Sequence, residues 1–391
     1  MIGGSDAATE LAALTAWTDA APPIRRDEYL ARMARARALT GAKGADALVV
    51  GAGDSLRYFT GVPWGATERL VAMVLPVDGD PILICPRFEL GSLEADLKIA
   101  ADIRLWEEDE DPAVLLAAAL PPRVAVDPAL AFGFVDRIRN AAPDTAFSNG
   151  EAVIDGCRTI KSAAELALLQ QAKHMTLEVH RRAARILTPG IRASEVRRFI
   201  DAAHRALGAA GSSFCIVHFG RATAFPHGLP EDDILSEGDM VLIDTGCRVE
   251  GYHSDITRSY VYGTPDAEQQ RIWDLEKAAQ QAAFDAARPG VTCAQVDNAA
   301  RAVLEAGGLG PDYRLPGLPH RTGHGIGLSI HEAPYLVRGS DAVLAPGMCF
   351  SNEPMIVIPD RFGVRLEDHF HVTETGAAWF TPPAPAIDRP V

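Results

Sequence analysis

Short apolar runs and amphipathic stretches alternate through the first part of the chain. Four runs rich in β-branched residues predict short strands, at 47–50, 70–75, 81–85 and 124–126. Glycine and proline turns separate these runs from Ala-rich stretches with helical periodicity, such as 29–39. Strands that alternate with helices are typical of an α/β domain, so the pattern predicts one over residues 1–155.

The second part of the chain, residues 156–391, begins with longer helical patterns. Apolar positions recur at helical intervals in three segments, which predicts helices over 162–187, 192–207 and 265–287. Ser162 is the expected N-cap of the first helix, and Thr264 is the expected N-cap of the third. No internal repeat stands out in this pattern.

After these helices the pattern changes to short strands joined by turns. The runs 240–244 and 256–262 flank a connection that contains glycine, which predicts a hairpin. The runs 349–353 and 363–367 flank a turn-rich segment and predict a second hairpin. Two acidic residues lie in or beside each pair of runs, so both hairpins would present carboxylates from neighbouring strands.

Five side chains with metal-binding groups belong to this region. They are Asp244, Asp255, His324, Glu353 and Glu367. A single carboxylate in a strand is usually solvated or ion-paired, but four beside apolar runs indicate joint burial, which is costly without a cation. Four carboxylates and one imidazole form an oxygen-rich set that suits two divalent ions such as manganese, cobalt or zinc. The sequence therefore predicts a binuclear metal centre and a metal-dependent hydrolase.

Two other interpretations of the glycine-rich run 320–332 fit the sequence less well. Its alternating glycines do not follow a strand in the order and spacing of a phosphate-binding loop. A His-Glu-x-x-His zinc helix is excluded, because Tyr335 stands where the second histidine of that motif would be.

The run 320–332 resembles the proline dipeptidase signature of the pita-bread metallopeptidases. That family includes prolidases, proline aminopeptidases, methionine aminopeptidases and the metal-free creatinases. The resemblance extends over about residues 160–382 and includes three further motifs: Phe225-Pro226-His227-Gly228, the pair Asp244 and Asp255 separated by ten residues, and Asn352-Glu353-Pro354.

This resemblance implies a fold and a set of metal ligands. The expected fold is α+β, with an α/β creatinase-like N-terminal domain at 1–155 and a pita-bread (creatinase/aminopeptidase) catalytic domain at 156–391. The implied ligand roles are one ion bound by Asp244, both ions bridged by Asp255 and Glu367, and the other ion bound by His324 and Glu353.

Three further histidines match the family pattern. His227 and His331 would line the substrate cleft, where they could donate hydrogen bonds to the scissile carbonyl or to the negative charge that grows on it. His320 would help to shape the same pocket.

Three more positions bear on the chemistry. Arg365 precedes Glu367 by two residues on one strand face, so it would orient either a metal-binding carboxylate or a substrate carboxylate. Thr257 would donate a hydrogen bond to a metal ligand. Val357 stands where many peptidases of the family have a tyrosine, so a histidine or water would have to serve in place of that hydroxyl.

The resemblance implies hydrolysis of the Xaa-Pro bond in dipeptides that end in proline, with manganese as the first expectation for the two ions. Glu353 would move the proton of the attacking water to the leaving nitrogen. Three alternatives stay open: removal of an N-terminal residue from longer Xaa-Pro peptides, as aminopeptidase P does, hydrolysis of a non-peptide amide, and a binding module without turnover.

Composition and charge set further limits. The chain has 391 residues, of which 48% are hydrophobic and 23% charged, which is ordinary for two globular domains. A net charge of −15 would repel nucleic acid and anionic lipid, so neither is an expected partner. The sequence shows no secretory leader and no membrane span, so we expect a cytoplasmic protein. By resemblance we also expect a homodimer, in which Trp64 could cover the partner's active site.

Overall fold

The computed structural model describes residues 2–226 and 228–391, and the chain divides into two compact units. The N-terminal unit comprises Ile24–Arg158. The C-terminal unit comprises Met1–Pro23 together with Thr159–Val391. Each unit has its own apolar core, and we describe each by itself.

The first residues of the chain belong to the C-terminal unit, although the sequence analysis placed them in the N-terminal domain. The backbone N–H groups of Gly3 and Trp17 donate to the carbonyls of Ala184 and Leu207, both at 2.9 Å. Helix α1 (Ala7–Ala12) lies between these two attachments. Such a short segment cannot form a core of its own, so its apolar side chains pack against a core that longer helices have built.

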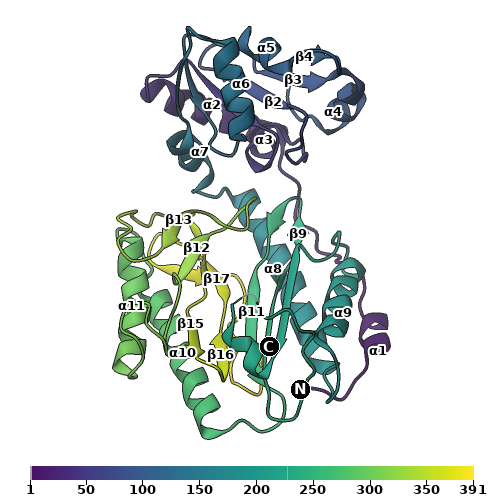
Figure 1. Cartoon of the computed structure of the whole chain (residues 1–391), viewed down its shortest axis with the longest axis vertical. Helices are drawn as coiled ribbons and strands as arrows, with labels where there is room; N and C mark the ends of the chain where they lie inside the picture. The colour runs from purple at the N-terminus through teal and green to yellow at the C-terminus, as the bar shows by residue number, and fades with distance from the viewer. Residues whose placement is uncertain (1, 227) are drawn as a thin grey trace. The chain divides into compact units, whose positions relative to one another are not determined.

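The N-terminal unit is built on a six-stranded mixed sheet in the order β4-β3-β2-β1-β5-β6 (Figure 1). The strands are β1 (Ala47–Gly51), β2 (Ala72–Pro76), β3 (Ile82–Pro86), β4 (Asp102–Trp106), β5 (Arg123–Val126) and β6 (Ala146–Asn149). The helices are α2 (Arg26–Ala42), α3 (Asp54–Thr60), α4 (Leu90–Asp96), α5 (Pro112–Ala117), α6 (Phe132–Ala141) and α7 (Glu151–Arg158). The four predicted strands correspond to β1, β2, β3 and β5. The strands at the two edges, β4 and β6, lack a continuous apolar run and neither is fully buried, so the apolar pattern does not predict them.

The C-terminal unit places a pair of helices on either side of its strands, with α10 and α11 on one side and α8 and α9 on the other (Figure 1). The helices are α8 (Ala163–Arg185), α9 (Ala193–Ala206), α10 (Ala267–Ala286) and α11 (Cys293–Ala306). The strands of the first sheet and its neighbouring ribbon are β7 (Phe214–Phe219), β8 (Met240–Gly246), β9 (Arg248–Val249), β10 (Tyr252–His253) and β11 (Ile256–Val261). The later strands are β12 (Gly323–Gly325), β13 (Glu332–Leu336), β14 (Cys349–Asn352), β15 (Met355–Ile358), β16 (Phe362–Arg365), β17 (Asp368–Val372) and β18 (Ala377–Trp379).

Of the two predicted helix N-caps, the one at Ser162 is confirmed and the one at Thr264 is wrong. Ser162 caps α8 as predicted, in a capping box with Glu165. The cap of α10 is Asp266 and not Thr264, because the Asp266 carboxylate accepts from the backbone N–H of Gln269 at 2.7 Å. A carboxylate at the N-terminus of a helix also interacts favourably with the helix dipole, which favours the later start.

Of the two predicted hairpins, the first is confirmed and the second is wrong. Strands β8 and β11 pair antiparallel as predicted. The run 349–353 does not pair with the run 363–367, because β14 pairs with β17 and β15 pairs with β16. Pro354 explains the difference: it has no N–H to continue a strand ladder, so the chain ends β14 before it and starts β15 after it.

An internal repeat relates the two halves of the C-terminal unit, although no sequence repeat stands out. The Pro-Gly turns at 189–190 and 289–290 precede α9 and α11, and each turn is followed by a β-bridge to a later segment. The first bridge joins Arg192 to Ile234 and the second joins Thr292 to Val343. Ten residues after each bridge partner stands an acidic residue, Asp244 or Glu353. The repeat therefore brings a carboxylate from each half to an equivalent place.

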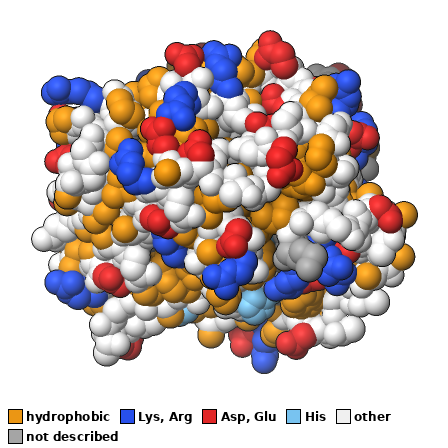
Figure 2. Space-filling view, turned by 90° about the horizontal axis from the view of Figure 1, so that it is seen from below, with side chains coloured by type: hydrophobic (Ala, Val, Ile, Leu, Met, Phe, Trp, Pro, Cys, Tyr) orange, Lys and Arg blue, Asp and Glu red, His pale blue; other side chains and the backbone are white. Residues whose placement is uncertain are grey.

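None of the helices in the described part of the chain combines the length with the apolar character that crossing a bilayer requires. On the face shown in Figure 2, acidic and basic side chains are interspersed, so the net charge of −15 is not gathered into a single acidic patch there.

Candidate metal centre and active site

The five predicted metal-binding side chains come together in the C-terminal unit. Asp244 lies in β8, Asp255 precedes β11, and His324 lies in β12. Glu353 follows β14, and Glu367 precedes β17. Four of the five are buried and Glu353 is partly exposed, so the group lies inside the unit with one side accessible.

The five side chains form two overlapping clusters. Ligand atoms of Asp244, Asp255 and Glu367 lie within 4.8 Å of one another, and so do those of His324, Glu353 and Glu367. Glu367 belongs to both clusters. Two neighbouring clusters that share a carboxylate are the arrangement that two bridged metal ions require.

Glycines allow strand β12 to carry His324 into this group. A Cβ atom on Gly323 would lie 2.1 Å from the Ser351 carbonyl oxygen, and one on Gly325 would lie 2.5 Å from the Glu332 carbonyl oxygen. No side chain tolerates contacts of that length, so β12 can lie between β13 and β14 only because these positions are glycine.

Burial raises the pKa values of three of the carboxyl groups. The pKa of Asp255 is well above its ordinary value because of burial and, secondarily, the charges of Glu367 and Asp244. Burial likewise raises the pKa values of Asp244 and Glu367. Glu353 differs: burial raises its pKa, but the hydrogen bond and charge of His324 outweigh this effect and lower the pKa to about 2. His324 Nε2 and Glu353 Oε1 are 3.1 Å apart.

The donor set fits divalent cations. Asp244 Oδ1 and Glu367 Oε1 are buried, and no residue in the described ranges donates a hydrogen bond to either oxygen. Buried acceptors without a partner cost free energy, and like charges held together cost more. Two divalent ions would satisfy both oxygens and neutralise the four carboxylates. We therefore regard this group as a candidate metal centre.

Arg365 and Thr257 hold two of the carboxylates in place. The Arg365 guanidinium donates to Asp244 Oδ2 at 2.5 Å and to Thr257 Oγ1 at 3.1 Å. The Thr257 hydroxyl in turn donates to Glu367 Oε2 at 2.7 Å. Arg365 therefore contacts the predicted metal ligand Asp244, and orienting a metal-binding carboxylate is one of the two roles predicted for it. Thr257 contacts a second predicted ligand, Glu367.

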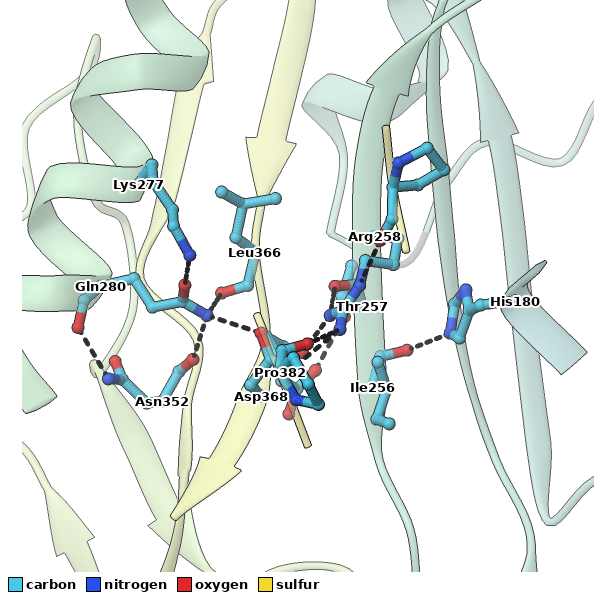
Figure 3. A network of polar contacts seen from close by, with 12 residues as sticks. His180, Ile256, Thr257, Arg258, Lys277, Gln280, Asn352, Leu366, Asp368 and Pro382 are labelled. Atoms are coloured by element: carbon cyan, nitrogen blue, oxygen red, sulfur yellow. Dashed lines mark hydrogen bonds and ion pairs between the residues drawn. The ribbon is translucent and has the colours of Figure 1, made fainter. Parts of the chain in front are cut away.

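A network of polar contacts joins the segments next to the candidate ligands in the sequence (Figure 3). Gln280 of α10 donates from its amide nitrogen to the Leu366 carbonyl at 3.0 Å, to Asp368 Oδ2 at 3.1 Å and to the Asn352 carbonyl at 3.4 Å. The Asn352 side chain donates back to the Gln280 carbonyl at 2.8 Å. Since these residues flank Glu353 and Glu367 in the sequence, one helix side chain joins the two segments that carry these glutamates.

Arg258 of β11 continues this network on the other side. Its guanidinium donates to the Glu367 carbonyl at 2.9 Å and to Asp368 Oδ1 at 2.7 Å, and both side chains of the ion pair are fully buried. It also donates to the carbonyls of Pro382 and Pro390, at 3.3 Å and 2.8 Å. Arg258 thereby connects the backbone of a predicted metal ligand to the last residues of the chain.

The cluster opens into a pocket of about 760 Å³. Its lining combines the four carboxylates with Arg365 and with a set of other side chains: Phe214, Ile216, Pro226, Pro319, His320, Arg321, Ile330 and His331. The His331 ring lies 4.2 Å from the His324 ring, centroid to centroid, and Asp255, His324 and His331 form a third group of potential metal-binding atoms. His227 lies outside the described residues.

Some residues of the site had no signal in the sequence. Gln280 and Arg258 act over 72 to 132 residues of sequence separation, and neither belongs to a motif. Arg321 lies in the run 320–332, but the motif implies no role for it. Val357 is buried in β15 and is not among the described residues that line the pocket.

Comparisons with known proteins agree with this geometry. Residues 167–374 match Metallopeptidase family M24, and residues 32–160 match the Creatinase/Prolidase N-terminal domain. The chain is 40% identical over 358 residues to the probable dipeptidase PepE of Mycobacterium tuberculosis, which covers 89% of this chain and 93% of that protein. It is 33% identical over 337 residues to the Xaa-Pro dipeptidase of Lactobacillus helveticus, with 84% and 90% covered.

A solved structure gives the same result. The crystal structure of dipeptidase PepE from Mycobacterium ulcerans matches with a TM-score of 0.87 at 37% identity, over 94% of this chain and 99% of that one. The expected α+β fold is confirmed, with a pita-bread catalytic domain and a creatinase-like N-terminal domain. The chain belongs to metallopeptidase family M24 and carries a Creatinase/Prolidase N-terminal domain ahead of its metallopeptidase part.

Proposed function

We propose that this metallopeptidase hydrolyses the Xaa-Pro bond of dipeptides that end in proline, with two divalent metal ions in its active site. The observation that carries the proposal is the pair of ligand clusters that share Glu367 and line a pocket together with apolar side chains. The similarity to the Xaa-Pro dipeptidase of Lactobacillus helveticus supports the same substrate class.

The proposed ligand roles follow the two clusters together with the third group, in which Asp255 lies beside His324. Asp244 would bind one ion, Asp255 and Glu367 would bind both, and His324 and Glu353 would bind the other. Manganese is the first choice, with cobalt and zinc as alternatives, because the set is mostly carboxylate oxygen with a single imidazole. Arg365 would keep the Asp244 carboxylate oriented through the contact described above.

The side chains around the cluster would have different roles in the reaction. Two bound ions would supply Lewis acidity, which polarises the scissile carbonyl and makes hydroxide available near neutral pH. Glu353 would accept the proton of the attacking water and deliver it to the proline nitrogen as that nitrogen leaves. His331, which is exposed in the pocket, would donate a hydrogen bond to the carbonyl oxygen as negative charge develops on it, and His227 would assist.

Val357 limits which side chains can donate hydrogen bonds during the reaction. A valine cannot donate a hydrogen bond, and this one is buried among apolar neighbours in the core. The proton transfers and hydrogen bonds of the reaction would therefore depend on Glu353 and the pocket histidines, with His320 helping to shape the pocket that surrounds them.

The test is cleavage of the Ala-Pro bond by chelator-stripped protein, with and without added manganese, with the products (proline from Ala-Pro, Pro-Ala from Ala-Pro-Ala) identified by chromatography. We expect manganese to restore cleavage of Ala-Pro and to leave Ala-Pro-Ala uncleaved. Cleavage of Ala-Pro-Ala would assign the protein to aminopeptidase P-type activity. Failure to cleave either peptide, in protein that holds its metal ions, would overturn the peptidase proposal and favour a non-peptide amide substrate or a binding module.

The proposed homodimer is tested by a separate measurement of mass in solution. Light scattering after size-exclusion chromatography should give twice the mass of the chain, which is 41.8 kDa. A mass of one chain would contradict it.

A further inference from the structure

The segment that carries Asp255 is held by buried side chains of helix α8. Ser254 and Asp255 stand between β10 and β11 and belong to neither strand, so regular strand pairing does not fix this part of the backbone. The hydroxyl oxygens of Thr176 and Ser254 lie 2.7 Å apart, and His180 Nε2 donates to the Ile256 carbonyl at 2.9 Å (Figure 3). Helix α8 therefore holds the chain immediately before and after a predicted metal ligand.

Lys173 of the same helix contacts the residue two positions before Asp255. Its ammonium group donates to the His253 carbonyl at 3.1 Å and lies 4.8 Å from the centroid of the Phe380 ring. The Lys173 side chain is fully buried, and no carboxylate among the residues that the structure describes forms an ion pair with it. A carbonyl and an aromatic face replace only part of the hydration of an ammonium group, so the burial of Lys173 has a net cost in free energy.

A second buried lysine shows what Lys173 lacks. Lys161 pairs with Glu332, whose side chain is 9% exposed. Burial lowers the pKa of Lys173 from 10.5 to about 8, and the nearby Cys349 and Asp255 oppose this shift only in part. Lys173 therefore stays charged at neutral pH without an ionic partner. An apolar side chain of similar length would avoid the cost, so the presence of a lysine here indicates a role in the neighbouring site.

The contact between Lys173 and His253 connects two parts of the metal centre. A hydrogen bond from a charged donor is roughly twice as strong as one between neutral groups, so it fixes the His253 carbonyl firmly. The His253 N–H donates to the carbonyl of Gly327 at 2.9 Å, and Gly327 follows His324 by three residues. His253 thus links the segments that carry Asp255 and His324, and Lys173 holds that link from behind.

We infer that Lys173 is a positioning residue of the metal centre, which fixes Asp255 relative to His324 through the His253 carbonyl and lowers the stability of the metal-free protein. The inference rests on the metal centre of the proposed function and adds to it a residue that no motif indicates. Lys173 does not line the pocket, so it can affect the reaction only through the ligands. One substitution should therefore change stability and metal binding in opposite directions.

The test is Lys173→Met, which keeps most of the length of the side chain and removes the charge and the donor. In chelator-stripped protein its melting temperature should be no lower than that of the wild type, because a buried unpaired charge is removed. Manganese affinity, measured by calorimetric titration, should weaken by about tenfold to hundredfold, as it does when contacts that orient ligands are lost. With manganese at saturation, kcat for Ala-Pro should fall and KM should change little, because no substrate contact is altered.

Two other lysines provide matched controls. Lys161→Met removes a buried ionic partner of Glu332, so it should lower the melting temperature of the stripped protein, in contrast to Lys173→Met. Lys43 is exposed in the N-terminal unit, so Lys43→Met should leave the melting temperature, the manganese affinity and kcat unchanged.

The outcomes differ for the inference and for the proposed function. If Lys173→Met binds manganese as tightly as the wild type, melts at a lower temperature or does not fold, the inference is wrong and Lys173 serves only the core. If the wild type binds manganese but does not cleave Ala-Pro, the proposed peptidase function is wrong, and the manganese affinity of the variant still decides the inference. If the wild type binds none of manganese, cobalt and zinc, both are wrong.

Discussion

The two units of the chain bury different kinds of side chain. In the described residues of the N-terminal unit, the buried charged side chains are Arg32 and Asp127, and most ion pairs lie at the surface. One example is Arg123–Asp46, whose side chains are 60% and 32% exposed. The C-terminal unit buries complete ion pairs, of which Arg258–Asp368 has no exposed surface. Because buried charge is costly, its concentration in one unit marks where charged groups are needed for chemistry.

The difference also separates two sources of stability. The N-terminal unit should depend on apolar packing, whereas the C-terminal unit should depend on linked polar contacts and on bound cations. Similar substitutions of charged or polar residues should therefore change activity and the free energy of unfolding more in the C-terminal unit than in the N-terminal unit.

The largest effect is expected for Asp255→Asn. Loss of this carboxylate from its cluster with Asp244 and Glu367 should lower proline release from Ala-Pro by roughly a thousandfold or more and reduce the bound metal. In chelator-treated protein the same change should raise the melting temperature, because it removes one of several mutually repelling buried carboxylates. Asp127→Asn, in the N-terminal unit, is the control and should leave activity unchanged. Full activity in Asp255→Asn would contradict the metal centre.

The next effect is expected for Arg258→Met. It leaves Asp368 buried without its partner and should cost about 3–5 kcal/mol in the free energy of unfolding, measured with denaturant. The double variant Arg258→Met, Asp368→Leu should recover much of this loss, because no charge is then left unpaired. If the single and double variants are equally unstable, the pair is held by something other than its charges.

A pH effect comes from His180, which is buried and donates from Nε2 to the Ile256 carbonyl at 2.9 Å. Burial lowers its pKa from 6.5 to about 3, so below pH 6.5 the unfolded chain binds a proton that the folded chain does not. Stability should therefore fall as the pH drops from 6.5 toward 3, by ~2 kcal/mol at pH 5 from this group.

The variant His180→Gln cannot take up a proton, so it isolates this contribution. Its stability should fall less steeply between pH 6.5 and pH 4 than that of the wild type, whatever its stability at neutral pH. Unfolding by denaturant at several pH values measures the slopes, and equal slopes would show that His180 does not contribute.

A smaller effect is expected for Gln280→Leu, which removes the amide that joins the segments carrying Glu353 and Glu367. Metal binding should weaken by about tenfold, since contacts that orient ligands have effects of that order. Titration of the stripped protein with manganese measures this directly. Gln281→Leu, which alters a neighbouring glutamine that bonds to Asp285 on the exposed side, is the control.

The smallest effect is expected for Arg123→Ala in the N-terminal unit. Its pair with Asp46 is solvent-exposed, so its loss should change the free energy of unfolding by less than about 1 kcal/mol. If Arg123→Ala lowers the free energy of unfolding as much as Arg258→Met does, ion pairs contribute equally to stability in the two units, which would contradict the proposed difference.

The ligand residues could be predicted from the sequence because metal chemistry restricts residue types. Asp244 and Asp255 stand in or beside apolar runs, and local periodicity is enough to predict their strands. The glycines around His324 mark a close backbone approach, which the structure shows against Ser351. These signals are local, so a single sequence contains them.

The partners of those residues could not be predicted, since they depend on contacts between distant segments. Gln280 meets Asn352 and Leu366 across 72 and 86 residues. The interruption of β14 at Pro354 changed which strands pair, and the internal repeat is visible only once equivalent bridges are compared. Such contacts follow from how helices and strands pack, and no local pattern records them.

The sequence by itself determined the kinds of groups at the centre of this protein, the strands that carry them and the metallopeptidase family that their motifs resemble. The tertiary structure decided which carboxylates share a cluster and which of the two pocket arginines pairs with a predicted ligand. The physical reason is that residue type and periodicity are local properties, whereas the pairing of buried charges depends on the packing of the whole unit.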